Sequence, residues 1–284
     1  MKNSSVLQKM ELIQSIFREV QDSFAENKSV EKLVASLDGY NVEFRSIAYE
    51  SASMCIAIDD YEKYNEIKFW FSFLNQNQEK HATQIHIGLG WALAQKEINP
   101  EPILEKFEPM MRYRVLDGYG YYEGIFRRRK SILNQQKPDF IDKTASSAYD
   151  QGLGRNMWYL NNGDIGAARN MIQKFPAERH ADFWRGLGIA ITYVGGCDEK
   201  YLQEIFTAAE NYQPNLAAGA MMGFVSRHYA GLDTEGSILA AEVLTHQSKD
   251  HILKLNEQLR TDLDVQNVNT YRMWIDGMEL HFNS

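Results

Sequence analysis

A pair of small residues two positions apart recurs five times along the chain, and this repetition limits the possible folds more than any other feature. Each pair lies in an apolar segment such as HIGLGWALAQ or WRGLGIAITYVGG. Glycine destabilises the interior of a helix, so its repeated use there indicates that a neighbouring helix comes very close. The pairs are Gly88/Gly90, Gly118/Gly120, Gly152/Gly154, Gly186/Gly188 and Ala217/Gly219.

Successive pairs are offset by 30, 34, 34 and 31 residues, which is the repeat length of solenoids built from helical hairpins. Each copy continues through an Asn/Gly/Asp turn into a second helix with apolar periodicity. Asp164, Asp198 and Asp233 are placed to cap three of these second helices. The sequence therefore predicts an all-α fold, a right-handed array of helical hairpins that forms a tetratricopeptide-like solenoid.

The whole chain, residues 1–284, is expected to form a single all-helical domain. Apolar residues in the first segment recur at steps of three and four, which is typical of an amphipathic helix. No segment shows the strict alternation of a half-buried strand. We expect N-terminal helices over residues 1–80, helical-hairpin repeats over residues 81–247 and C-terminal capping helices over residues 248–284.

Composition and charge exclude several classes of protein. The formal net charge is -8, which argues against binding to nucleic acids or anionic membranes, because both need a basic face. No segment approaches the roughly 18 apolar residues of a membrane span. The two cysteines, Cys55 and Cys197, form no disulfide or zinc pattern and suit a reducing compartment. We expect a cytoplasmic protein. The sequence assigns no metal ligands, and it leaves any cofactor and any dependence on a metal undetermined.

Five sequence blocks suggest a family. They are AYESASMCIAI, IHIGLGWALA, LDGYGYYEGIF, DQGLGRNMWYL and FWRGLGIAITYVGG, in this order, over roughly residues 40–230. Together they resemble an uncharacterised bacterial family of enediyne-biosynthesis-associated proteins. The resemblance implies a part in specialised-metabolite biosynthesis and supplies no reaction. Relatives tend to have Phe-His after the second glycine, where this chain has Tyr121 and Tyr122, so a site that depends on that histidine is not implied here.

The stretch DGYGYYEGIF surrounds its glycines with tyrosines and carboxylates, which makes Asp117, Tyr122 and Glu123 the candidate catalytic residues. On a regular helix the two carboxylates point about 120° apart, so a joint site would need a kink. The alternative is that one is a buried hydrogen-bonding group and the other is solvated. Arg155, one repeat later, is the expected partner of Asp117 or Glu123, because an unpaired buried arginine is very costly.

The candidate substrate-binding residues lie on the same glycine-bearing helices. Aromatic residues at helical spacing usually form a core, but large rings opposite small residues can also leave an elongated apolar cavity. A packing histidine and structural ion pairs are the alternatives for the remaining candidates. The candidates are His86, Trp91, Tyr119, Arg155, Trp158, Trp184 and Arg185.

Two functions are compatible with these residues. In the first, an aromatic-lined pocket between helical repeats binds or converts a long apolar, unsaturated intermediate of a polyene or isoprenoid-like kind. In the second, the chain is a non-catalytic tetratricopeptide-like scaffold that holds a partner protein. The partner is accordingly a hydrophobic small molecule or a biosynthetic enzyme. The apolar character of the inner helices favours the pocket.

Overall fold

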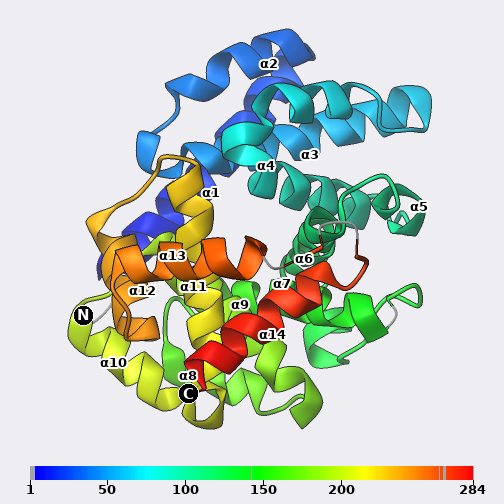
Figure 1. Ribbon diagram of the computed structural model, residues 1–284. Coiled ribbons are helices and arrows are strands. Elements are labelled where there is room, and N and C mark those ends of the chain that lie inside the picture. The colour runs from blue at the N-terminus through cyan, green and yellow to red at the C-terminus, as the bar shows by residue number, and fades with distance from the viewer. Residues whose placement is uncertain (1–3, 142, 262, 265–266, 284) are drawn as a thin grey trace.

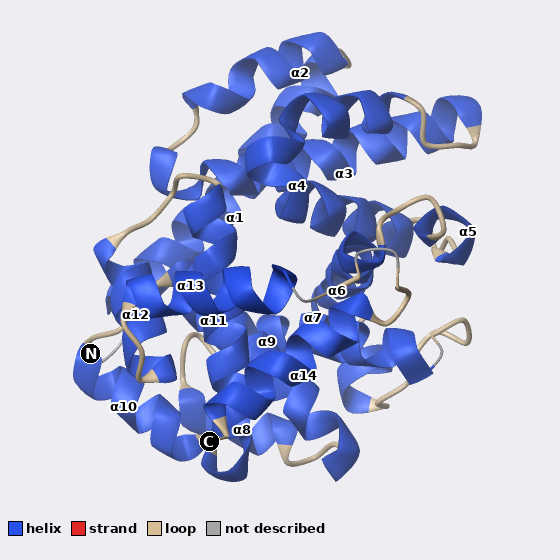
Figure 2. Ribbon diagram, in the orientation of Figure 1, coloured by secondary structure: helices blue, strands red, loops and turns tan. Residues whose placement is uncertain are grey.

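The computed structural model describes residues 4–141, 143–261, 263–264 and 267–283, and most of them are helical (Figures 1 and 2). No strand occurs in these ranges. The prediction of an all-α protein is therefore confirmed. None of the helices in the described part of the chain is both long and apolar enough to span a bilayer.

Fourteen α-helices follow one another along the described chain. They are α1 (Ser4–Asn27), α2 (Val30–Ser36), α3 (Arg45–Tyr64), α4 (Phe69–Gln95), α5 (Glu101–Leu104), α6 (Pro109–Phe126), α7 (Lys143–Leu160), α8 (Ile165–Ile172), α9 (His180–Val194), α10 (Glu199–Ala208), α11 (Gln213–Tyr229), α12 (Glu235–Thr245), α13 (Lys249–Thr261) and α14 (Thr270–Phe282). Short 3-10 or π turns connect several of them.

Six of these helices form an inner array in which each packs against the next, in the order α3, α4, α6, α7, α9 and α11 (Figure 1). The array curves, because α11 returns to α4, where Gln84 Nε2 donates to Ser226 Oγ at 3.2 Å. Helices α8, α10 and α12 pack against one another beside it. Helix α1 lies against α3 and α9, and α14 lies against α6 and α11.

The paired glycines hold the inner helices together at very short range. A Cβ atom on Gly152 would lie 2.0 Å from the carbonyl oxygen of Asp117 on the preceding helix. A Cβ atom on Gly154 would lie 2.3 Å from the carbonyl oxygen of Phe183 on the following helix. The first glycine thus faces one neighbour and the second faces the other. The same rule holds at Gly88/Gly90, Gly118/Gly120 and Gly186/Gly188. The predicted packing role of the glycines is confirmed.

The predicted alignment of the fifth pair, Ala217/Gly219, is wrong by two residues. A Cβ atom on Gly219 would lie 1.9 Å from the carbonyl oxygen of Arg185 on α9. This is the contact that the first glycine of a pair makes with the preceding helix. Gly219 therefore corresponds to Gly186, and Ala217 has no glycine counterpart in the other pairs. The small side chain of alanine made the two positions look equivalent in the sequence.

Serine takes the place of glycine at the start of the array. A Cβ atom on Gly88 would lie 2.1 Å from the carbonyl oxygen of Glu50, and Ser53 Oγ donates to the carbonyl oxygen of Ile85 at 2.5 Å. Ser51 and Ser53 on α3 thus occupy the positions of a glycine pair. The repeated helix contact extends to α3, which lies within the segment we expected to hold only N-terminal helices.

Helix α4 bends back sharply on itself. The rings of Trp70 and His86 lie 5.6 Å apart, although sixteen residues separate them in the chain. A straight helix would place their Cα atoms about 24 Å apart, far beyond the reach of both side chains. The first part of α4 therefore returns along α3, and the part that carries Gly88 and Gly90 belongs to the inner array.

Two of the three predicted helix caps are confirmed. Asp164 and Asp198 accept backbone N–H bonds at the beginnings of α8 and α10. Asp233 does not cap α12. Thr234 does so within a capping box, and Asp233 instead forms an ion pair with Lys249 at 2.8 Å. The helix begins one residue later than expected because the capping box satisfies its first N–H groups in both directions.

Candidate functional site

A cavity of about 390 Å³ lies between α1 and the inner array. Helix α1 covers one side of it, and α3, α4, α6, α7 and α9 supply the other sides. Its wall is mostly aromatic and aliphatic, and a few polar side chains reach it. The aromatic residues are Phe17, Trp91, Tyr121, Phe126, Tyr159 and Tyr193. The charged and amide side chains from the array are Glu50, Arg155 and Asn156.

The helical repeat explains why these side chains converge. Trp91, Tyr121 and Arg155 each follow the first glycine of their pair by three residues. Tyr159 and Tyr193 follow theirs by seven residues. Positions four apart lie on the same face of a helix, so each inner helix directs side chains from consecutive turns toward the cavity. Close packing through glycine brings the equivalent side chains of neighbouring helices together.

An ion pair between Arg155 and Asp117 forms the polar end of the cavity. The guanidinium carbon of Arg155 lies 4.9 Å from the centre of the Tyr121 ring, which adds a cation–π contact. Asp117 is buried behind the arginine, where Gln151 Nε2 donates to its Oδ2 at 2.5 Å. Of the two partners expected for Arg155, it is thus Asp117 that pairs with it.

Glu50 is the second charged group at this end of the cavity, and we did not predict it. It is 3% exposed, and its Oε2 atom makes no hydrogen bond with the described residues. Burial raises the pKa of Glu50 to about 7, while Arg155 lowers it and Asp117 raises it further. A carboxyl group with this pKa can donate or accept a proton near neutral pH, as general acid–base chemistry requires.

Asn156 adds further unsatisfied polar atoms to the cavity. Its side chain is buried, and neither its Oδ1 nor its Nδ2 atom makes a hydrogen bond with the described residues. Buried polar atoms in folded proteins are nearly always hydrogen-bonded. Glu50 and Asn156 therefore offer donors and acceptors to a molecule or to waters that occupy the cavity.

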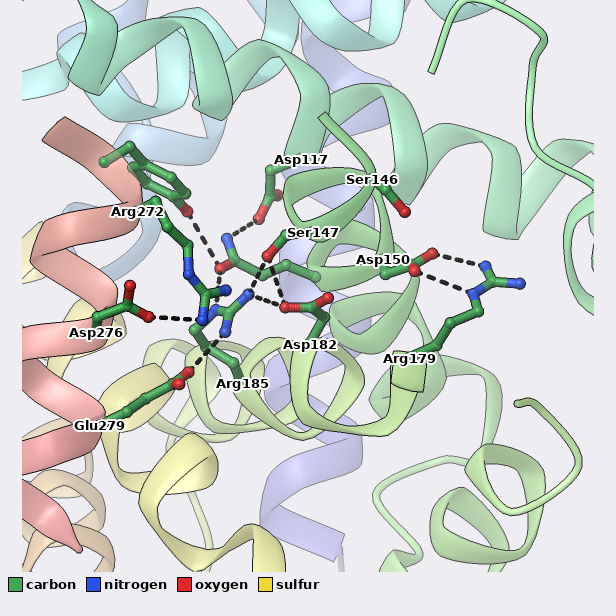
Figure 3. A network of polar contacts seen from close by, with 12 residues as sticks. Asp117, Ser146, Ser147, Asp150, Arg179, Asp182, Arg185, Arg272, Asp276 and Glu279 are labelled. Atoms are coloured by element: carbon green, nitrogen blue, oxygen red, sulfur yellow. Dashed lines mark hydrogen bonds and ion pairs between the residues drawn. The ribbon is translucent and has the colours of Figure 1, made fainter. Parts of the chain in front are cut away.

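A buried polar network continues behind the ion pair (Figure 3). Gln151 Oε1 accepts from Arg185 Nε at 2.8 Å and from the Tyr271 hydroxyl at 3.2 Å. Arg185 is completely buried, and its Nη1 donates to Glu279 Oε1 on α14 at 2.7 Å. This arrangement fixes the orientation of the Gln151 amide, whose nitrogen then faces Asp117. The network supports the floor of the cavity but does not itself line it.

The predicted carboxylates Asp117 and Glu123 do not share a site. Glu123 is fully buried and pairs with Arg127, whose Nη1 donates to its Oε1 at 2.5 Å. Helix α6 remains regular through its glycines, so the two carboxylates point in different directions. Tyr122 is half-buried and packs edge-on against Trp91, with ring centres 5.8 Å apart, outside the lining of the cavity.

The predicted substrate-binding residues divide between the cavity and the core. Trp91 and Arg155 line the cavity, and Arg185 lies in the network behind it. The others do not line it. They are His86, which bonds to the carbonyl oxygen of Ala82 at 2.7 Å, Tyr119, which packs against Phe140, and the buried Trp158 and Trp184.

One signal in the sequence points to Glu50. It directly precedes Ser51, as Asp117 precedes Gly118 and Gln151 precedes Gly152. Serine concealed this correspondence, because the repeat was recognised from glycine and alanine alone. The remaining missed residues, such as Tyr159, could have been found by counting one further helical turn from the glycines.

No group of three or more His, Cys, Asp or Glu side chains in the described ranges is arranged to hold a metal ion. Asp60 on α3 has a structural role. Asp60 Oδ2 accepts from the backbone N–H groups of Lys68 and Trp70 at 2.8 and 2.9 Å, which fixes the beginning of α4.

Comparison with known proteins places the chain in a family. No curated protein and no solved structure matches it. A family model described as "Protein of unknown function (DUF1702)" matches residues 1–282. The match includes every helix that forms the cavity and the polar network. The chain therefore belongs to the DUF1702 family.

Proposed function

We propose that the protein binds a small, largely apolar and unsaturated molecule in the cavity between α1 and the inner array. The observation that carries this proposal is the combination of an aromatic wall with a charged end formed by Glu50 and Arg155. A volume of about 390 Å³ lies within the usual range for small-molecule sites. The polar end of the ligand would lie against these two residues.

The same groups could act on a bound polyene or isoprenoid-like chain. Glu50 could give a proton to a double bond or take one from a neighbouring carbon, because both of its protonation states are accessible near neutral pH. The faces of Trp91 and Tyr121 would stabilise positive charge that develops on the chain. Arg155 would orient a carbonyl or anionic group of the ligand.

The proposal also includes a biosynthetic role and a type of helical repeat. We infer a role in specialised-metabolite biosynthesis of the enediyne type from the resemblance of the five sequence blocks. We also propose that the array is a right-handed solenoid of the tetratricopeptide kind. The regular spacing of the glycine pairs and the outer helices α8, α10 and α12 support this description.

The alternative is a scaffold that binds a partner protein. Such a scaffold would present its inner face as an open groove for a peptide. Here α1 covers the aromatic side chains of the inner helices, and Phe17 on α1 packs against Trp91 with ring centres 4.6 Å apart. This contact favours the small-molecule site.

A fluorescent polyene tests the proposal. cis-Parinaric acid is a linear tetraene carboxylic acid whose fluorescence rises in apolar surroundings. We expect it to bind the wild-type protein and to lose at least tenfold in affinity in Ile125→Trp, because Ile125 lines the cavity and the larger ring would fill it. The matched control is Leu133→Trp, which lies on the surface and should bind like the wild type.

Two results would count against this function. The first is an absence of binding by the wild-type protein, together with native mass spectra of the purified protein that show no retained small molecule. The second is equal binding by Ile125→Trp and the wild type, which would place the polyene elsewhere on the protein.

A further inference from the structure

A second cavity, of about 370 Å³, lies between α4, α6, α11, α13 and α14. It shares no lining residue with the first cavity. Three cationic side chains reach it, namely Lys80, Arg114 and Arg260, and Glu79 is the carboxylate among its lining residues. This excess of positive charge stands out in a chain whose formal net charge is -8.

Arg114 is the unusual member of this group. It is 9% exposed, and its guanidinium carbon lies 5.6 Å from the ring centres of both Tyr271 and Trp274. Nothing in the described part of the chain forms an ion pair or a hydrogen bond with its side chain. Contacts with aromatic faces offset only part of the cost of burying a charge. The side chain thus lacks the anionic partner that its position calls for.

The other buried arginines show what such a partner looks like. Arg179 donates to both carboxylate oxygens of Asp150, at 3.0 and 2.6 Å. Arg185 donates to two carboxylates, and Arg227 donates to three backbone carbonyl oxygens. Arg114 is the exception among the buried arginines of the described chain, and it faces a cavity.

We propose that this cavity binds the phosphate or carboxylate group of a small amphiphilic anion. Arg114 would hold the anionic group, because a guanidinium can form two parallel hydrogen bonds to either group. Lys80 and Arg260 are exposed at the rim and would attract the anion. Met110 and Met222 supply an apolar surface for a short chain attached to the anionic group.

Calorimetric titration with three molecules of eight carbon atoms each tests this site. Octyl phosphate or octanoate should bind the wild-type protein, and octanol should bind at least tenfold more weakly. Arg114→Gln should lower the affinity for the anion at least tenfold. Arg128→Gln, an exposed arginine outside the cavity, is the control for the loss of one charge and should bind like the wild type.

The pair of anions identifies the group that is recognised. Binding of octyl phosphate alone assigns a phosphate site, and binding of octanoate alone assigns a carboxylate site. The proposal is overturned if neither anion binds, if octanol binds equally well, or if Arg114→Gln binds like the wild type.

Two further variants distinguish a loss of anion binding from a loss of folding, and binding in this cavity from binding in the first one. If Arg114→Gln unfolds, the double variant Lys80→Gln/Arg260→Gln changes exposed residues only and should still lower the affinity several-fold. Unchanged affinity in this double variant would then overturn the proposal. Ile125→Trp should leave anion binding unchanged, so the two sites can fail independently.

Discussion

Replacement of Glu50 by glutamine should make the protein more stable at high pH and leave its stability at low pH nearly unchanged. Glu50 is buried beside the ion pair of Arg155 and Asp117. No cationic side chain among the described residues forms an ion pair with Glu50 itself. A glutamine of similar shape has no charge to bury. The expected difference between the two proteins therefore arises from the ionised form of Glu50.

The magnitude follows from the pKa of Glu50, which burial raises from 4.5 in the unfolded chain to about 7 in the folded protein. Between these values the folded protein keeps a proton that the unfolded chain releases. The free energy of unfolding therefore falls as the pH rises through this window and stays lower above it. The full difference corresponds to about 3 kcal/mol.

Urea denaturation at pH 5 and pH 8 measures this effect. At each pH we compare the free energy of unfolding of Glu50→Gln with that of the wild type. We expect this difference to be about 2 to 3 kcal/mol more favourable to the variant at pH 8 than at pH 5. Glu178→Gln, an exposed carboxylate far from the cavity lining, should show no such dependence. A gain for Glu50→Gln that is the same at both pH values would refute the reasoning, because desolvation of the carboxylate would then not govern its ionisation.

Three further changes test the packing and the polar network. Gly188→Ala should lower the free energy of unfolding, measured by urea denaturation, by about 1–3 kcal/mol or more, because its Cβ would lie 2.1 Å from a backbone oxygen of α11. Gly39→Ala is the control and should change it little, because no atom lies within 4 Å of the added Cβ. Arg185→Met should cost about 3–5 kcal/mol by the same measurement, since it removes a buried cation from the part-buried carboxylates of Asp182 and Glu279 and a donor from the buried Gln151. A loss below 1 kcal/mol would contradict this. Glu123→Gln should lower the melting temperature by weakening its contact with Arg127, but parinaric acid should bind as before, and a loss of binding would show that Glu123 serves the cavity.

The all-α class and the close packing of the glycine-bearing helices were predictable from the sequence. Glycines at matching positions of successive helices have few roles other than close helix contact, so these contacts could be predicted from their spacing. The first helix of the array could not be predicted, because Ser51 and Ser53 take the place of the glycine pair there and serine does not indicate a close helix contact in a sequence. The bend within α4 was also hidden, since Trp70 and His86 lie on one continuous helical segment.

The site was predictable only in part, for a related reason. Arg155 could be expected to pair with Asp117 or Glu123, because it lies one repeat later beside an equivalent glycine, but only the structure identifies Asp117 as the partner. The role of α1 could not be foreseen, because an amphipathic helix shows which face it buries but not which distant segment receives it. Phe17 reaches Trp91 across more than seventy residues of sequence, and both rings form part of the cavity wall.

The residue before the first small residue of each pair links the packing to the site. Four of the six inner helices carry a polar residue there, in the order Glu50, Asp117, Gln151 and Arg185. Because the glycines bring the helices so close, these side chains meet in the interior and must satisfy one another. Asp117, Gln151 and Arg185 do so through direct hydrogen bonds or through Arg155. Glu50 is the member that keeps an unpaired oxygen, and it faces the cavity. The repeat that stabilises the array thus leaves one buried carboxyl group at the cavity with an oxygen that no described residue satisfies.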